Sequence, residues 1–96
     1  MGYKALVIVE MFSASIDQQT IFQHTLIDEK WTKINSISST WKVSFKEVVK
    51  RDYAISIITE DIRKAKKKSR IPSLNIGIQL SGEEVILESF KSGGNG

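Results

Sequence analysis

The clearest pattern along the chain is an alternation of apolar and polar side chains in residues 40–46, Thr-Trp-Lys-Val-Ser-Phe-Lys. In an extended backbone Trp41, Val43 and Phe45 would point to one side, which is typical of a half-buried strand. Residues 74–80 place leucine or isoleucine at every second position and predict another such strand. Residues 3–10 contain an unbroken apolar run and predict a strand covered on both faces or nearly so.

Two other segments repeat their apolar residues at steps of three and four, the spacing of one helix face. The first is residues 16–30, where Ser15 and Gln18 have the spacing of a capping box. The second is residues 53–69, with acidic residues early and lysines late, as the helix dipole favours. We expect Asp52 to cap the start of the second helix, and the single proline to close its end.

Two further strands complete the predicted order. Residues 32–38 would form a hairpin with residues 40–46, with a bulge or turn inside them because their apolar spacing is irregular. Residues 84–90 would form a last short strand after a Ser-Gly turn. Residues 91–96 are glycine-rich and predict a disordered tail.

The resulting order is strand, helix, strand, strand, helix, strand and an extra strand. It predicts an α+β fold of the ferredoxin-like βαββαβ type with an additional C-terminal strand, in a single domain spanning residues 1–90. Both helices would cover one face of an antiparallel sheet whose first and third strands are central. The apolar sides of the strands would face the helices, and Lys42, Lys46, Asn75 and Gln79 would lie on the open face.

Composition and charge narrow the classes of protein only slightly. The 96 residues are 41% hydrophobic and 26% charged, which is typical of a folded domain. The chain has no cysteine, which excludes disulfides and cysteine-ligated zinc and favours a cytoplasmic protein. No apolar run approaches the about 18 residues of a membrane span, so no membrane partner is expected. The formal net charge of +3 favours nucleic acid only weakly.

Six of the eight residues from 63 to 70 are lysine or arginine. Such a run can contact the phosphates of RNA or DNA with strong salt dependence, or it can be a solvated helix end whose cations complement the helix dipole. An acidic or nucleic-acid-binding protein could use the same surface. The candidate binding residues are the six cations of the run and two lysines of the open face: Arg63, Lys64, Lys66, Lys67, Lys68, Arg70, Lys42 and Lys46.

Glu10 is the candidate catalytic residue, because it ends the first predicted strand. Two such carboxylates in a symmetric dimer could hold one Mg²⁺; the alternative is an ordinary charged residue where a strand meets solvent. Mg²⁺ is expected only for a nuclease, and otherwise no cofactor is expected and the metal ligands are unknown. The single histidine, His24, lies in mid-helix without a recognisable catalytic partner. Exposed edges of the sheet predict a homodimer, with residues 84–90 covering an edge of their own sheet or crossing to a partner.

Glu10 at the end of the first strand, Trp31, the Ser-Thr-Trp-Lys-Val stretch at 39–43 and a final strand pair at 74–90 together form a recognisable layout. In this layout, which covers most of residues 3–90, the chain resembles the small ferredoxin-like proteins related to the CRISPR-adaptation endonuclease subunit and to the type V antitoxin endoribonuclease. The resemblance implies a dimer that contacts nucleic acid, in some members with metal-dependent nuclease activity. The family typically has aspartate where this chain has Glu10, a departure that bears on cleavage.

Three hypotheses follow for the function. The first is a nucleic-acid-binding protein that is a divergent relative of these nucleases. The second is a protein–protein interaction module, such as a phage or mobile-element inhibitor or a toxin–antitoxin component. The third, in which the protein is an enzyme, is a Mg²⁺-dependent endoribonuclease that uses Glu10, and it is the least expected.

Overall fold

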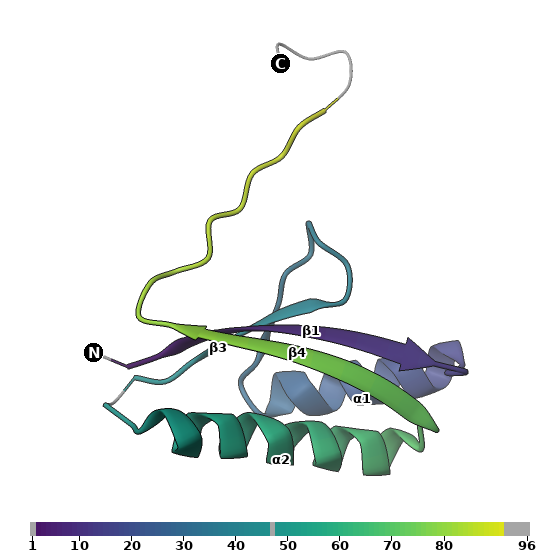
Figure 1. Ribbon diagram of the computed structural model, residues 1–96. Coiled ribbons are helices and arrows are strands. Elements are labelled where there is room, and N and C mark those ends of the chain that lie inside the picture. The colour runs from purple at the N-terminus through teal and green to yellow at the C-terminus, as the bar shows by residue number, and fades with distance from the viewer. Residues whose placement is uncertain (1, 47, 92–96) are drawn as a thin grey trace.

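The computed structural model describes residues 2–46 and 48–91 and consists of two layers. A four-stranded antiparallel sheet with the order β2-β3-β1-β4 forms one layer, and two helices cover one of its faces (Figure 1). This arrangement confirms the ferredoxin-like α+β prediction, with the first and third strands in the centre. The elements are β1 (Lys4–Phe12), α1 (Ile16–Asp28), β2 (Thr32–Lys33), β3 (Thr40–Ser44), α2 (Arg51–Ser69) and β4 (Ser73–Ser81).

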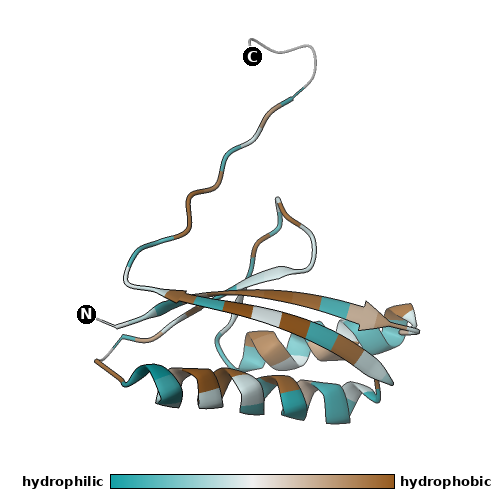
Figure 2. Cartoon of the chain, in the orientation of Figure 1, coloured by the Kyte–Doolittle hydropathy of each residue, from teal (hydrophilic) through white to brown (hydrophobic). Residues whose placement is uncertain are grey.

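The core lies between the sheet and the helices. In the central strand β1, Val7 is fully buried and pairs with Trp41 on one side and Ile78 on the other. Phe22 of α1 and Ile58 of α2 are fully buried against the same layer. The alternation in β3 and β4 therefore places the apolar side chains toward the helices as predicted, and Figure 2 shows the alternating apolar and polar bands along β4.

The two helices begin and end for different reasons. Ser15 and Gln18 form the predicted capping box at the start of α1, with bonds of 2.9 and 3.1 Å between each backbone N–H and the other side chain. The prediction that Asp52 caps α2 is wrong, because Lys50 is the N-cap and makes no side-chain capping bond. Asp52 lies in the first turn instead, where its charge still complements the helix dipole.

Of the strand predicted at residues 32–38 only the first two residues form, whereas the predicted turn inside this segment and the predicted hairpin with the next strand are confirmed. Only Thr32 and Lys33 pair with β3, and residues 35–39 turn back toward it. The Lys33 ammonium donates to carbonyl oxygens of this turn, including that of Ile34 at 3.2 Å, and Ser39 adopts a left-handed φ of 63°. The turn therefore takes residues that a longer strand would need, while Ile34 stays buried.

Two expectations about exposed surfaces are also corrected. Strand β1 is covered on one face only, because both helices lie on the same side, and Ile8 on the other face is 52% exposed. The additional C-terminal strand does not form: residues 83–91 have no regular structure and run away from the sheet (Figure 1). Of the predicted disordered tail, residues 92–96 lie outside the described residues.

Trp31 ties the end of α1 to α2 and to the sheet. Its indole N–H donates to Asp61 Oδ2 at 2.9 Å, and its ring meets that of Trp41 edge-to-face with centroids 6.3 Å apart. Burial raises the pKa of Asp61 above its ordinary value, and the hydrogen bond from Trp31 opposes that shift. The folded protein therefore stabilises the ionised carboxylate of Asp61 less than water does.

We expect the stability difference between Asp61→Asn and the wild type to depend on pH. The pKa of Asp61 is higher in the folded state than in the unfolded state, so at pH values between the two the folded state binds more protons. The free energy of unfolding therefore falls as the pH rises through this range. Asparagine keeps an acceptor for the Trp31 N–H but does not ionise. Urea unfolding of both proteins should therefore be measured at pH 3 and pH 7. The free energy of unfolding of the variant, relative to that of the wild type, should be higher at pH 7 than at pH 3. A difference independent of pH would contradict this account.

Candidate nucleic-acid interface

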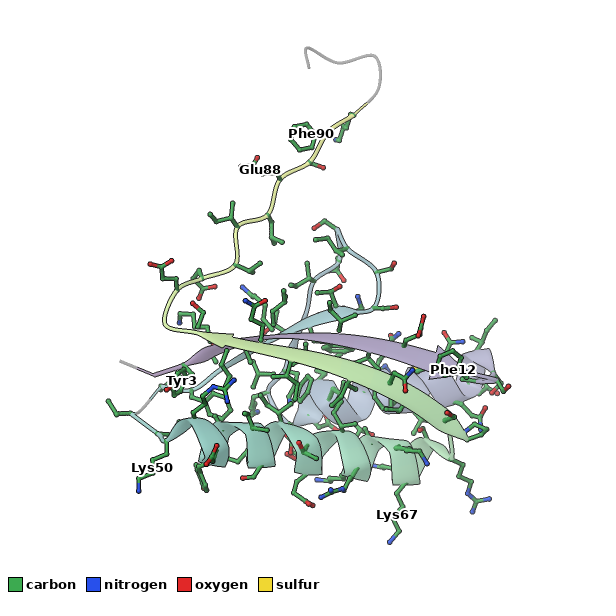
Figure 3. All side chains as sticks on the ribbon, in the orientation of Figure 1. Tyr3, Phe12, Lys50, Lys67, Glu88 and Phe90 are labelled. Carbon is green, nitrogen blue, oxygen red and sulfur yellow. The ribbon has the colours of Figure 1, made fainter. Side chains whose placement is uncertain are left out.

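The C-terminal half of α2 turns one stripe toward the core and a broad basic surface toward solvent. At every third or fourth position a residue is buried, and the lysines and arginines between these positions are exposed. Figure 3 shows Lys67 pointing away from the sheet at this end of the helix. The buried residues are Ala54, Ile58, Ile62, Ala65 and Ser69.

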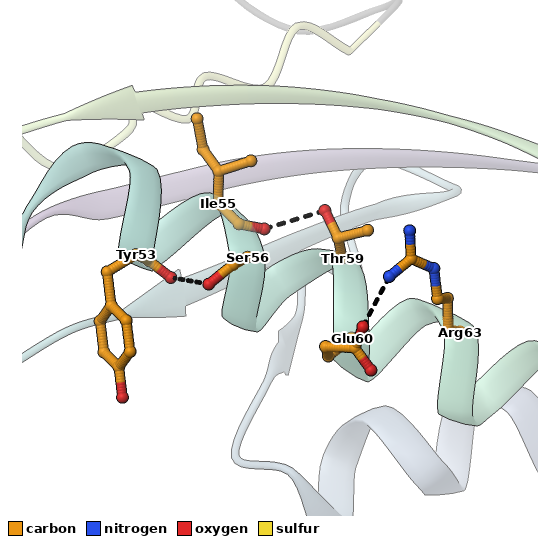
Figure 4. Close-up of polar contacts among 6 residues, drawn as sticks. All are labelled: Tyr53, Ile55, Ser56, Thr59, Glu60 and Arg63. Atoms are coloured by element: carbon orange, nitrogen blue, oxygen red, sulfur yellow. Dashed lines mark hydrogen bonds and ion pairs between the residues drawn. The ribbon is translucent and has the colours of Figure 1, made fainter.

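Two cations of the basic run are engaged in ion pairs. Arg63 donates to Glu60 one turn earlier in α2, at 2.6 Å (Figure 4). Lys64 pairs with Glu29 at the end of α1 at 2.5 Å, and this hydrogen bond raises the pKa of Lys64. These carboxylates offset two of the six charges, so the run is less positive than it reads in the sequence.

The remaining cations form what we call the basic cluster: Lys66, Lys67, Lys68 and Arg70. All four are exposed, and within residues 2–46 and 48–91 none of them forms an ion pair with a carboxylate. The helix dipole places partial negative charge at this end of α2, which holds the cations locally without neutralising them. The cluster is therefore available to an external anion.

Arg70 also ends the helix. It adopts a left-handed conformation with φ 62° as the C-cap, and its N–H donates to the carbonyl of Lys66 at 2.9 Å. The side-chain amide of Gln18, in the first turn of α1, donates to the Arg70 carbonyl at 2.9 Å. These contacts fix the backbone from which the basic cluster projects.

The open-face lysines of the predicted site lie apart from the basic cluster. Trp41 and Val43 face the core, so Lys42 between them lies on the face of β3 opposite the helices, and Lys46 is exposed just beyond β3. Glu84 bridges Lys42 at 3.7 Å and Lys4 at 3.2 Å, and the hydrogen bond from Lys4 lowers the pKa of Glu84. The structure thus divides the predicted binding residues between two opposite sides of the molecule.

The candidate catalytic residue stands alone. Glu10 is exposed on the open face of β1, directly opposite Asn75 of β4. In the part of the chain that the structure describes, no three histidine or carboxylate side chains come together as a group that could hold a metal ion. His24 is exposed on α1. The hypothesis that Glu10 of two copies holds a shared Mg²⁺ therefore stays a prediction.

The sequence prediction missed the carboxylates that pair with candidate binding residues and offset their positive charge. Glu60 lies three residues before Arg63, a spacing at which charges on a helix meet, so this pair had a local signal. Glu29 and Lys64 come from different helices, and Glu84 reaches Lys4 from the other end of the chain. These two contacts depend on the tertiary structure and have no signal in the local sequence.

The comparisons with known proteins bear on the fold. No protein-family model matches the chain, and no curated protein sequence matches it at a significant level. The structure is similar to the crystal structure of protein SP2199 from Streptococcus pneumoniae, a structural genomics target. The TM-score is 0.56 and the identity 12%, over 88% of this chain and 90% of that one. At such low identity the likeness shows the fold alone, which agrees with the ferredoxin-like arrangement. No helix among the described residues is long and apolar enough to cross a membrane.

Proposed function

We propose that the chain binds the phosphate backbone of RNA or DNA through the basic cluster. One observation carries the proposal: four exposed cations at one helix end have no carboxylate partner among the described residues. Cations that contact phosphates release counterions from the nucleic acid, which makes binding favourable and sensitive to salt. The resemblance to dimeric ferredoxin-like proteins that contact nucleic acid supports the same function.

The proposed binding is independent of base sequence. From Ala54 to Ser89 the chain has no aromatic residue, so most of α2 and the segment that follows it supply no ring on which a base could stack. Lysine and arginine at phosphates position a protein on nucleic acid but carry no sequence information. The proposal includes no cleavage step, because Glu10 lies on the opposite face from the cluster. We further propose that the protein is a homodimer and acts in the cytoplasm, where a chain without cysteine is at home.

Arg70→Gly separates binding from folding, because the two effects have opposite signs. Glycine removes the cost of a left-handed arginine, about 1–2 kcal/mol, against a loss of about 0.5–1 kcal/mol in chain entropy. We therefore expect stability to rise by about 0.5–1 kcal/mol. Loss of one phosphate contact should lower the slope of log K against log salt by about 0.9. Thermal unfolding and fluorescence-anisotropy titration measure the two effects.

Lys30→Gly is the matched control. Lys30 is also left-handed, with φ 73°, and lies at the end of α1 outside the basic cluster. The control makes the same backbone change and removes one positive charge, so it should gain similar stability and keep the salt slope. If both variants lower the slope equally, net charge rather than the cluster governs binding, and the assignment to α2 is wrong.

A further inference from the structure

Besides the basic cluster, a second exposed feature of the molecule is the segment of residues 83–91, which we call the arm. The arm leaves the end of β4 and extends away from the sheet on the side opposite the helices (Figure 1). Ile86 is 83% exposed and Phe90 is 90% exposed, and Figure 3 shows Phe90 far from the rest of the domain. A contiguous apolar segment held in water is a mark of an interaction surface.

The root of the arm is fixed to the open face. Glu84 bridges Lys4 of β1 and Lys42 of β3, and Val85 and Leu6 both line a cavity of about 180 Å³. Because this root crosses the face and then rises from it, the outer part of the arm leaves its own sheet uncovered. The arm is thus placed to reach a molecule that approaches the open face.

The open face itself carries apolar side chains along β1. Ile8 is 52% exposed and Phe12 41% exposed, and Leu6 is partly buried beside the cavity. Next to Ile8 the paired residue of β4 is Gly77, and a Cβ added there would meet no atom within 4 Å. Ile8 and Gly77 therefore form a shallow apolar notch that can receive a side chain.

We propose that the open face and the arm form a homodimer interface, in which the arm of each copy lies across the open face of the other. Ile86 and Phe90 would pack on Leu6 and Ile8 of the partner, with one side chain in the notch at Gly77. A two-fold axis makes both contacts equivalent and closes the assembly at two copies. The proposal deepens the homodimer part of the proposed function, and it does not depend on nucleic-acid binding.

Self-complementarity and area support a second copy as the occupant. The arm and the open face belong to the same chain and both expose apolar side chains, so two copies related by a two-fold axis can cover both at once. The lysines of the open face add nothing to this argument, since Lys4 and Lys42 already pair with Glu84 of their own chain. The open face of the three neighbouring strands β3, β1 and β4 has an area of roughly 400 Å², because the strands have up to nine residues and lie about 4.8 Å apart. The outer part of the arm, residues 86–91, adds roughly 200 Å² at the about 10 Å width of one packed layer. Each copy would thus bury about 600 Å², the lower end of the range for stable interfaces.

The interface would leave the basic clusters free. The helices cover the face opposite the open face, so α2 of each copy would lie on the outside of the dimer. The dimer would then present two basic clusters, one on each outer side. Oligomeric state can therefore be measured without nucleic acid, and failure of the dimer would leave the proposed phosphate contacts untouched.

Size-exclusion chromatography with light scattering tests the proposal on the full chain. The wild type should elute at twice its 10.8 kDa mass. Ile86→Ser combined with Phe90→Ser should raise the dissociation constant at least tenfold, and the control Ile16→Ser with Val48→Ser should not. The control residues are each 80% exposed and lie away from the arm and the open face. Gly77→Val should also weaken the dimer, because valine suits a strand but fills the notch.

A wild type that stays monomeric at high concentration would overturn the proposal. So would a dimer that is weakened neither by Ile86→Ser with Phe90→Ser nor by Gly77→Val. Pairing between copies is tested by disulfide formation, since the chain has no cysteine of its own. A mixture of Ile8→Cys and Phe90→Cys chains should give a cross-linked heterodimer. Val48→Cys mixed with Phe90→Cys should not, and equal cross-linking in both mixtures would contradict the proposed contact.

Discussion

Replacing Lys66, Lys67 and Lys68 with alanine is expected to weaken nucleic-acid binding about 100-fold at low salt. Each lysine near an anionic surface contributes about 1 kcal/mol, so three contribute about 3 kcal/mol, which corresponds to about two orders of magnitude in affinity. The slope of log K against log salt should fall by about 2.7, since three phosphate contacts are lost. The helix should persist, because alanine favours helices and all three side chains are exposed.

The control for this variant removes the same charge elsewhere. Lys30, Lys46 and Lys50 are exposed and lie outside both the basic cluster and the arm, so their replacement by alanine also lowers the net charge by three. This control includes Lys46, which was a predicted binding residue on the open-face side. If the control loses as much affinity as the cluster variant, binding follows net charge or uses the open face, and the proposed interface is wrong.

Trp41→Ala should cause the largest loss of stability in the chain. Trp41 is 2% exposed, pairs with Val7 in the sheet and contacts the ring of Trp31 edge-to-face. Truncating a buried aromatic residue costs about 3–5 kcal/mol, against a typical total of about 5–15 kcal/mol for a domain. Urea unfolding, followed by far-ultraviolet circular dichroism, should show a much lower midpoint or an unfolded protein.

Two further variants keep this prediction interpretable. Trp41→Phe retains most of the apolar volume and should lose clearly less stability than alanine. Tyr53→Ala removes an aromatic ring that is 58% exposed and should change stability by less than about 0.5 kcal/mol. A small effect of Trp41→Ala, close to that of Tyr53→Ala, would show that Trp41 does not anchor the core.

Much of the fold could be predicted because the local patterns agree with the tertiary structure. The alternation at Trp41 and Val43 matched a sheet with one buried face, and the spacing of Ser15 and Gln18 marked the start of α1. Such patterns are readable because strands have a period of two and helices a period of 3.6. At residues 32–38 the rules predicted the turn but made the strand before it too long, because the Lys33 ammonium binds the carbonyl groups of the turn and of its flanks.

The remaining errors come from features without a local signal. Residues 84–90 have the composition of a strand, but whether a strand forms depends on a neighbouring strand that accepts its hydrogen bonds. The candidate site was predicted in outline, since the basic run does end α2. Its extent was not predicted, because Glu29 comes from α1 to pair with Lys64, and Glu84 comes from beyond β4 to pair with Lys42.

Fluorescence anisotropy of the wild type with short labelled duplexes and single strands, in about 50 and 200 mM salt, tests the central claim most directly. Four phosphate contacts predict a slope of log K against log salt of about −3.6 for a duplex, or an affinity about 100-fold lower at the higher salt. A slope of this size would confirm that the protein binds phosphates with the number of cations in the basic cluster, and its loss in the triple alanine variant would assign the binding to α2. Absence of binding at low salt would contradict the account and reduce the basic cluster to a solvated helix end.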